Sequence, residues 1–120
     1  MPAAFERHRT VDAPLDAVAA TLADFDALDR WSGAVDHTSA LSDPPDGPHA
    51  VRRVQVGRRT VVERVVEWDL PSTLAYRLDG LPKPLGEVVN RWTLTAAGER
   101  TEVTLTSTVD AGPKPVGRLV

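Results

Sequence analysis

Apolar and polar residues alternate along most of the second half of the chain, and this period of two predicts β-strands. The clearest case is residues 101–110, where valine and leucine on one face oppose glutamate and threonine on the other. The same alternation, broken by turns rich in proline and glycine, predicts five earlier strands at residues 35–43, 49–57, 58–69, 73–80 and 87–96. Short connections between these segments predict an antiparallel meander.

A different period appears near the N-terminus. Residues 4–11 predict a strand, and Pro14 then suits a first helical position, because its φ is fixed near helical values and it lacks an N–H. The next apolar residues recur three and four positions apart and predict an amphipathic helix: Leu15, Val18, Ala19, Leu22 and Phe25. Residues 25–31 predict a second short helix. The whole order predicts an α+β fold with a strongly curved antiparallel sheet of about seven strands.

Length and composition narrow the class of protein. The 120 residues fit a single domain, 1–120, and 42% apolar with 26% charged residues is typical of globular chains. With a net charge of −3, we expect no nucleic-acid partner. The absence of cysteine excludes disulfides and thiolate chemistry. No apolar run approaches the ~18 residues of a membrane span, so we expect a cytoplasmic protein without stable membrane insertion. The excess of arginine over lysine suggests a GC-rich bacterial genome.

Several phrases, in their order and spacing, resemble the START-like superfamily, also called SRPBCC or polyketide cyclase/dehydrase and lipid transport proteins. They are TVDAPLDAV, LADFDALDRW, ERVVEWDLPSTLAYRL and RWTLTAAGERTEVTLTSTVD, and they cover nearly the whole chain. The resemblance implies a helix-grip fold, in which a seven-stranded antiparallel sheet wraps a long C-terminal helix around a hydrophobic cavity. Only residues 116–120 remain for that helix after Pro115, so we expect it to be truncated. The concave face would then be open, or covered by a homodimer.

Arg7 and Arg9 are two cations on one face of a predicted strand whose ends are apolar on that face. They suit a carboxylate or polyphenolate ligand in the cavity, because a guanidinium binds such groups through paired hydrogen bonds. The alternative is that they pair across the sheet with acids such as Glu63 and Glu67, or that the strand is an edge with both faces in water.

His37 is a candidate general acid or base near neutral pH, and the alternative is a strand histidine satisfied by a neighbour. It forms no ready dyad with Asp36, because adjacent strand residues point to opposite faces. The three histidines follow no metal-binding spacing, so neither a metal site nor a cofactor is expected. Four arginines surround the predicted Gly57 turn, at positions 52, 53, 58 and 59, and are expected to form a solvated hairpin tip.

Tyr76, Asn90 and Ser107 are polar positions on otherwise apolar strand faces. Such groups either orient a small ligand or satisfy one another internally. The tryptophans at positions 31, 68 and 92 are expected in the core or the cavity wall.

The sequence therefore predicts binding or transport of a small hydrophobic or amphipathic ligand, lipid- or polyketide-like, in a cavity between sheet and helices. The expected ligand contacts are Arg7, Arg9, Trp31, His37, Val54, Tyr76, Asn90, Trp92, Leu105 and Ser107. One alternative is a polyketide cyclase or aromatase with His37, Tyr76 and Arg7 as candidate acid–base groups. A further alternative is a module that binds a protein partner through its exposed concave face.

Overall fold

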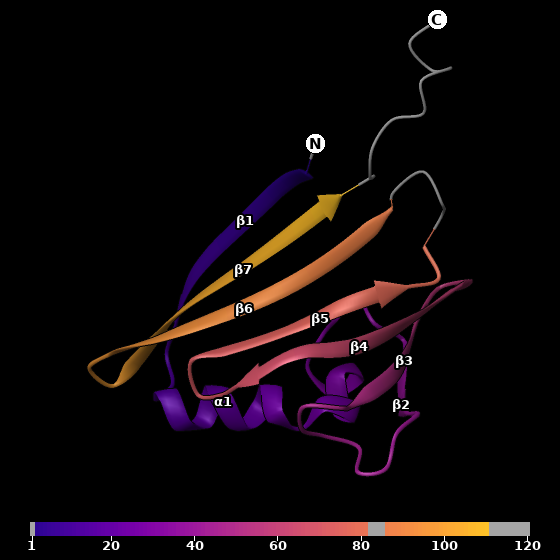
Figure 1. Ribbon diagram of the computed structural model, residues 1–120. Coiled ribbons are helices and arrows are strands. Elements are labelled where there is room, and N and C mark those ends of the chain that lie inside the picture. Colours follow the sequence, from indigo (N-terminus) through magenta and orange to yellow (C-terminus); the bar gives the residue numbers. More distant parts are fainter. Residues whose placement is uncertain (1, 82–85, 111–120) are drawn as a thin grey trace, which may run out of the picture.

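The computed structural model describes residues 2–81 and 86–110. Their strands form one antiparallel seven-stranded sheet in the order β1-β7-β6-β5-β4-β3-β2, strongly curved in Figure 1. The strands are β1 (Pro2–Val11), β2 (His37–Ala40), β3 (Val51–Val56), β4 (Arg59–Asp69), β5 (Thr73–Asp79), β6 (Glu87–Ala97) and β7 (Arg100–Asp110). An α-helix, α1 (Leu15–Ala23), and a 3-10 helix, η1 (Phe25–Arg30), separate β1 from β2. The predicted α+β fold with seven strands and two short early helices is confirmed.

Pro14 lies just before α1 rather than at its first helical position. Its ψ of 158° is extended, and its carbonyl accepts the N–H groups of Ala17 and Val18. The proline therefore caps the helix from outside, one residue earlier than predicted.

The strand at residues 35–43 is shorter than predicted, because β2 spans only His37–Ala40. Just beyond Leu41, the Ser42 hydroxyl accepts a hydrogen bond from the N–H of Val51 at 2.9 Å. That N–H would otherwise bond to a backbone carbonyl if the pairing of β2 with β3 continued. The predicted truncated C-terminal helix falls in residues 111–120, which lie outside the described residues.

Strand register determines which side chains share the concave face of the sheet. In β1, Arg7 lies opposite Leu105 and Arg9 opposite Val103. Leu105 in turn lies opposite Trp92 of β6. Because paired residues point to the same face, Arg7, Leu105 and Trp92 form one row across three strands.

The hydrophobic core lies between this concave face and the two helices. Phe25 of η1 is fully buried and meets the rings of Trp68 and Tyr76 edge-on, with centroids 6.4 and 5.8 Å away. Ala19 and Leu22 present the buried side of α1 to the same cluster. None of the helices in the described part of the chain is long and apolar enough to cross a membrane.

Candidate functional site

A pocket of about 260 Å³ lies between α1 and the concave face, and we call it the helix compartment. It is lined by Val11, Ala13, Ala17, Val18, Thr21, Leu22, Trp31, Trp92 and Val103. Apart from Thr21 and the indole nitrogens, this lining is apolar. Its size is close to the lower end of the range of small-molecule sites, about 300–1,000 Å³.

A second hollow of about 530 Å³, the β1 compartment, continues along the first strand. Its lining is Arg7, His8, Arg9, Val11, Trp31, Trp92, Val103 and Leu105. Four of these residues also line the helix compartment, so the two hollows adjoin and form one site with an apolar part and a cationic part.

Trp31 and Trp92 form the wall common to both compartments. Their rings meet edge-on at 74°, with centroids 6.0 Å apart. Trp31 follows η1 and remains 42% exposed, so an unusually large aromatic surface is left open to the pocket and solvent. The indole N–H of Trp92 donates to the Tyr76 hydroxyl at 3.0 Å, which fixes the orientation of that ring.

Behind Trp92, the three polar residues of the apolar strand faces bond to one another. The Ser107 hydroxyl donates to the Asn90 side-chain oxygen at 2.6 Å, and Asn90 also hydrogen bonds with the Tyr76 hydroxyl. Burial, reinforced by the charge of Glu63, raises the pKa of Tyr76 above its ordinary value of 10.0. Within the described residues, none of the three lines either compartment. Tyr76, Asn90 and Ser107 thus hydrogen bond with one another, as in the second of the two possibilities that the sequence left open for them.

A buried ion pair anchors η1 to the sheet. Arg52 and Glu63 face each other across β3 and β4, with side chains 4% and 8% exposed and a nitrogen–oxygen distance of 2.6 Å. Arg52 also donates to the Phe25 carbonyl at 2.7 Å, and its guanidinium lies 3.8 Å from the Phe25 ring centre and 4.7 Å from that of Tyr76. Burial raises the pKa of Glu63, and the charge and hydrogen bonds of Arg52 oppose that rise.

Arg52 is thus not part of a solvated hairpin tip, as its proximity to Gly57 had led us to expect. Because Trp31 immediately follows η1, the Arg52 bond to the η1 backbone also supports the position of the pocket wall.

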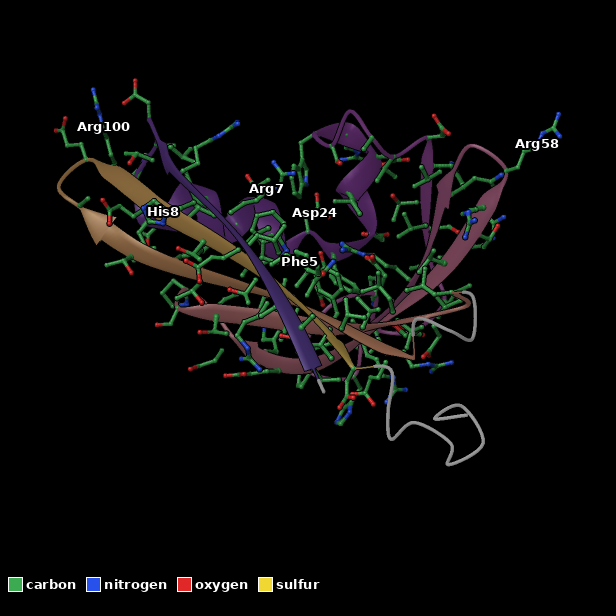
Figure 2. All side chains as sticks on the ribbon, turned by 90° about the horizontal axis from the view of Figure 1, so that it is seen from above. Phe5, Arg7, His8, Asp24, Arg58 and Arg100 are labelled. Atoms are coloured by element: carbon green, nitrogen blue, oxygen red, sulfur yellow. The ribbon has the colours of Figure 1, made fainter. Side chains whose placement is uncertain are left out.

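Arg7 and Arg9 line the β1 compartment, and both are exposed on β1, which is an edge strand of the sheet as one of the alternatives had it. Figure 2 shows Phe5 and Arg7 on one side of β1 and His8 on the other, as strand alternation requires. The glutamates that were alternative partners are engaged elsewhere: Glu63 with Arg52, and Glu67 with an arginine of β6. Among the described residues, Arg7 and Arg9 form no ion pair.

The other candidate residues lie apart from the pocket. His37 is at the opposite edge of the sheet from β1, and its Nδ1 lies 3.8 Å from a carboxylate oxygen of Asp29. Val54 is buried in β3 and is 3% exposed. No cluster of three or more metal-ligating side chains occurs in residues 2–81 and 86–110.

Of the ten expected contact residues, five line the pocket: Arg7, Arg9, Trp31, Trp92 and Leu105. Leu22 of α1 was expected to line or support the cavity and does line the helix compartment, but Ala17 and Thr21, four positions apart on the same helix, were missed. The signal in the sequence was that Ala17 and Thr21 form a second row of small side chains on the helix, beside its apolar residues. The buried pair of Arg52 and Glu63 was also missed, although pairing outward from the Gly57 turn places these two residues opposite each other.

Comparisons with known proteins agree with this architecture. The closely similar structures include the Zhui aromatase/cyclase from Streptomyces sp. R1128, with 24% identity, a TM-score of 0.78, and coverage of 96% of this chain and 72% of that one. A Thermobifida fusca protein shares 26% identity with a TM-score of 0.79, covering 92% and 75% of the two chains. A START superfamily protein from Mycobacterium smegmatis has a TM-score of 0.74 at 14% identity, covering 97% and 83%. The fold is therefore the START or helix-grip fold.

None of the curated proteins compared with this chain is similar enough in sequence to count as a relative. A sequence profile of the family described as "Polyketide cyclase / dehydrase and lipid transport" matches residues 2–120, almost the entire chain. The protein therefore belongs to the polyketide cyclase/dehydrase and lipid transport family.

Proposed function

We propose that the protein binds a small hydrophobic or amphipathic molecule in the pocket formed by the helix and β1 compartments. The observation that carries this proposal is the partly exposed Trp31 ring, which stands edge-on to Trp92 in the wall of an apolar hollow. Exposed aromatic surface that lines a concavity favours ligand burial over solvent contact. We place this activity in the cytoplasm.

Blocking the helix compartment tests the proposal. N-phenyl-1-naphthylamine is a neutral fluorescent probe whose emission rises when it leaves water, and we expect saturable binding to the wild-type protein. Ala17→Trp places a large ring at a pocket-lining position on the exposed side of α1 and should weaken binding at least tenfold. Ala20→Trp adds the same ring to the same helix outside this lining and should leave the affinity within about twofold. Equal affinities for wild type and Ala17→Trp would refute the proposal.

A cyclase or aromatase activity is the alternative that the family description keeps open. Acid–base catalysis needs a proton donor or acceptor within hydrogen-bond reach of the reacting carbonyl. The three candidate groups lie apart: Arg7 on one edge strand, His37 on the other, and Tyr76 buried behind Trp92. An enzyme predicts that His37→Ala abolishes turnover with the fold retained, whereas a binding protein predicts no change in affinity for the neutral probe.

A partner-binding role for the concave face, including a homodimer, makes a different prediction. Native mass spectrometry of the freshly purified protein, before and after organic extraction, distinguishes the cases. An extractable bound mass supports the ligand pocket and identifies its natural occupant. A dimer without a bound mass supports the partner-binding role instead.

A further inference from the structure

We infer that the ligand is an amphipathic anion: its apolar body lies in the helix compartment, and its carboxylate or similar oxyanion is bound by Arg7 and Arg9. This inference rests on the proposed function, because it names the class of ligand for the same pocket. Three features support it: the position of the two cations, the absence of an acidic partner for them among the described residues, and the continuity of the two compartments.

The position follows from the register of the sheet. Arg7 and Arg9 lie two residues apart on one strand face, which separates their Cα atoms by about 7 Å. They stand beside Leu105 and Val103 of the next strand, and Trp92 continues the row of Arg7. Both arginines therefore adjoin an apolar floor, and both remain exposed and accessible to a ligand.

Within the described residues, neither arginine has an acidic partner. No carboxylate occurs in the lining of either compartment, and no ion pair or side-chain hydrogen bond involves Arg7 or Arg9 in residues 2–81 and 86–110. The neighbouring Glu6 points to the opposite face of β1, where it lies across from Thr106. Five of the nine strand arginines do have acidic partners, including the partly exposed ones at positions 64, 77 and 91.

Two adjacent guanidinium groups repel each other, and an oxyanion placed between them removes that repulsion. Each guanidinium can donate two parallel hydrogen bonds to a carboxylate, and such charge-assisted bonds are about twice as strong as neutral ones. The pair on β1 therefore presents an anion-binding site that is already formed in the free protein.

The two compartments meet at Trp31 and Trp92, so one molecule can reach both. The helix compartment has no charged side chain in its lining, and the indole N–H of Trp92 is already used by Tyr76. An apolar body is thus preferred there, with the anionic group in the adjoining β1 compartment. An entirely apolar ligand would leave the arginines unused, and a small inorganic anion would leave the helix compartment empty.

A matched pair of probes separates the two halves of the site. N-phenyl-1-naphthylamine and 8-anilinonaphthalene-1-sulfonate share the same aromatic body, and only the second carries an anionic group. In the double variant Arg7→Gln/Arg9→Gln we expect the affinity for the sulfonate to fall about tenfold at low salt, while the affinity for the neutral probe changes less than twofold. Raising the ionic strength should weaken sulfonate binding to the wild type far more than binding to the variant.

The control is Arg58→Gln/Arg59→Gln, which removes the same charge from the exposed β3–β4 turn and should leave both affinities unchanged. An unchanged sulfonate affinity in Arg7→Gln/Arg9→Gln, or an equal loss in the control, would overturn the inference while the neutral probe still supports the pocket. If neither probe binds the wild type, the proposed function fails as well.

Competition then identifies the source of the carboxylate. Stronger displacement of the sulfonate by dodecanoate than by 1-naphthoate indicates an acyl chain, and the reverse order indicates an aromatic acid; both outcomes support an anionic ligand. Displacement by neither carboxylate would contradict it.

Discussion

Replacing Arg52 with methionine should destabilise the protein in a way that depends on pH. Methionine keeps much of the aliphatic volume beside Phe25 and Tyr76 but removes the cation that faces Glu63. Without Arg52, nothing in this contact opposes the effect of burial, so the pKa of Glu63 in the folded variant rises further above its ordinary value of 4.5. A raised carboxyl pKa contributes stability that is present below the unfolded-state value and is lost as pH rises through the folded-state value.

The magnitude follows from the contacts that disappear: the ion pair with Glu63, the hydrogen bond to the Phe25 carbonyl and the contacts with two aromatic rings. Below about pH 4.5, Glu63 is protonated in folded and unfolded variant alike, and the remaining loss comes from the Phe25 carbonyl and the two ring contacts. A buried acceptor left without its donor costs about 1–3 kcal/mol. Near pH 7 the glutamate must either ionise without a partner or stay protonated, and breaking a buried pair costs about 3–5 kcal/mol.

Urea unfolding at a series of pH values, followed by tryptophan fluorescence, measures this difference in free energy. The loss in Arg52→Met should grow between pH 4.5 and pH 8. Arg91→Met is the matched control, because it breaks an arginine–glutamate pair that is partly exposed and should cost less than about 1 kcal/mol. Arg52→Met/Glu63→Leu should recover part of the stability at pH 7. A loss that is the same at all pH values, or no larger than that of the control, would refute this account.

Three further predictions concern the parts of the fold that position the site. Gly57→Ala should destabilise the protein by about 1 kcal/mol, because the glycine φ is +59°, while Gly33→Ala has open space around it and should change the unfolding free energy little. Burial raises the pKa of Asp79, but the hydrogen bonds and charges of Arg64 and Arg77 together outweigh it and hold the pKa below its ordinary value of 3.8. The stabilisation lost in Asp79→Asn should therefore be measurable at pH 7 and vanish as pH falls through the folded-state pKa; an undiminished loss at pH 2 would contradict this. Thr38→Val removes the hydroxyl that accepts the Asp29 N–H and should cost about 1–2 kcal/mol in thermal or urea unfolding, whereas Thr38→Ser should cost clearly less.

Local sequence patterns predicted the elements of the fold well, because each strand carries its own alternation. The turn at Gly57 is one example. Its φ is positive, a conformation that glycine adopts readily, so the glycine in the sequence marks the turn. The length of β2 was not predictable in the same way. It ends where the Ser42 side chain competes for the N–H of Val51, a contact between two segments separated by a long turn.

The site was only half predictable for a similar reason. Alternation placed Arg7, Trp92 and Leu105 on the concave face, and they do line the pocket. The same rule placed Val54 and Tyr76 on that face too, but could not tell which part of the face the helices cover. That division depends on where η1 sits, and η1 is held by Arg52 through a backbone carbonyl.

The most direct test of the pocket is a titration of the ¹⁵N-labelled protein with N-phenyl-1-naphthylamine, observed at the indole N–H signals of its three tryptophans. Trp→Phe variants assign each signal. We expect the Trp31 and Trp92 signals to shift saturably with the affinity found by fluorescence, while the signal of Trp68, which packs on Phe25 in the core, stays in place. Saturable shifts confined to Trp68, or no saturable shift at Trp31 and Trp92, would contradict the central claim that this pocket binds the ligand.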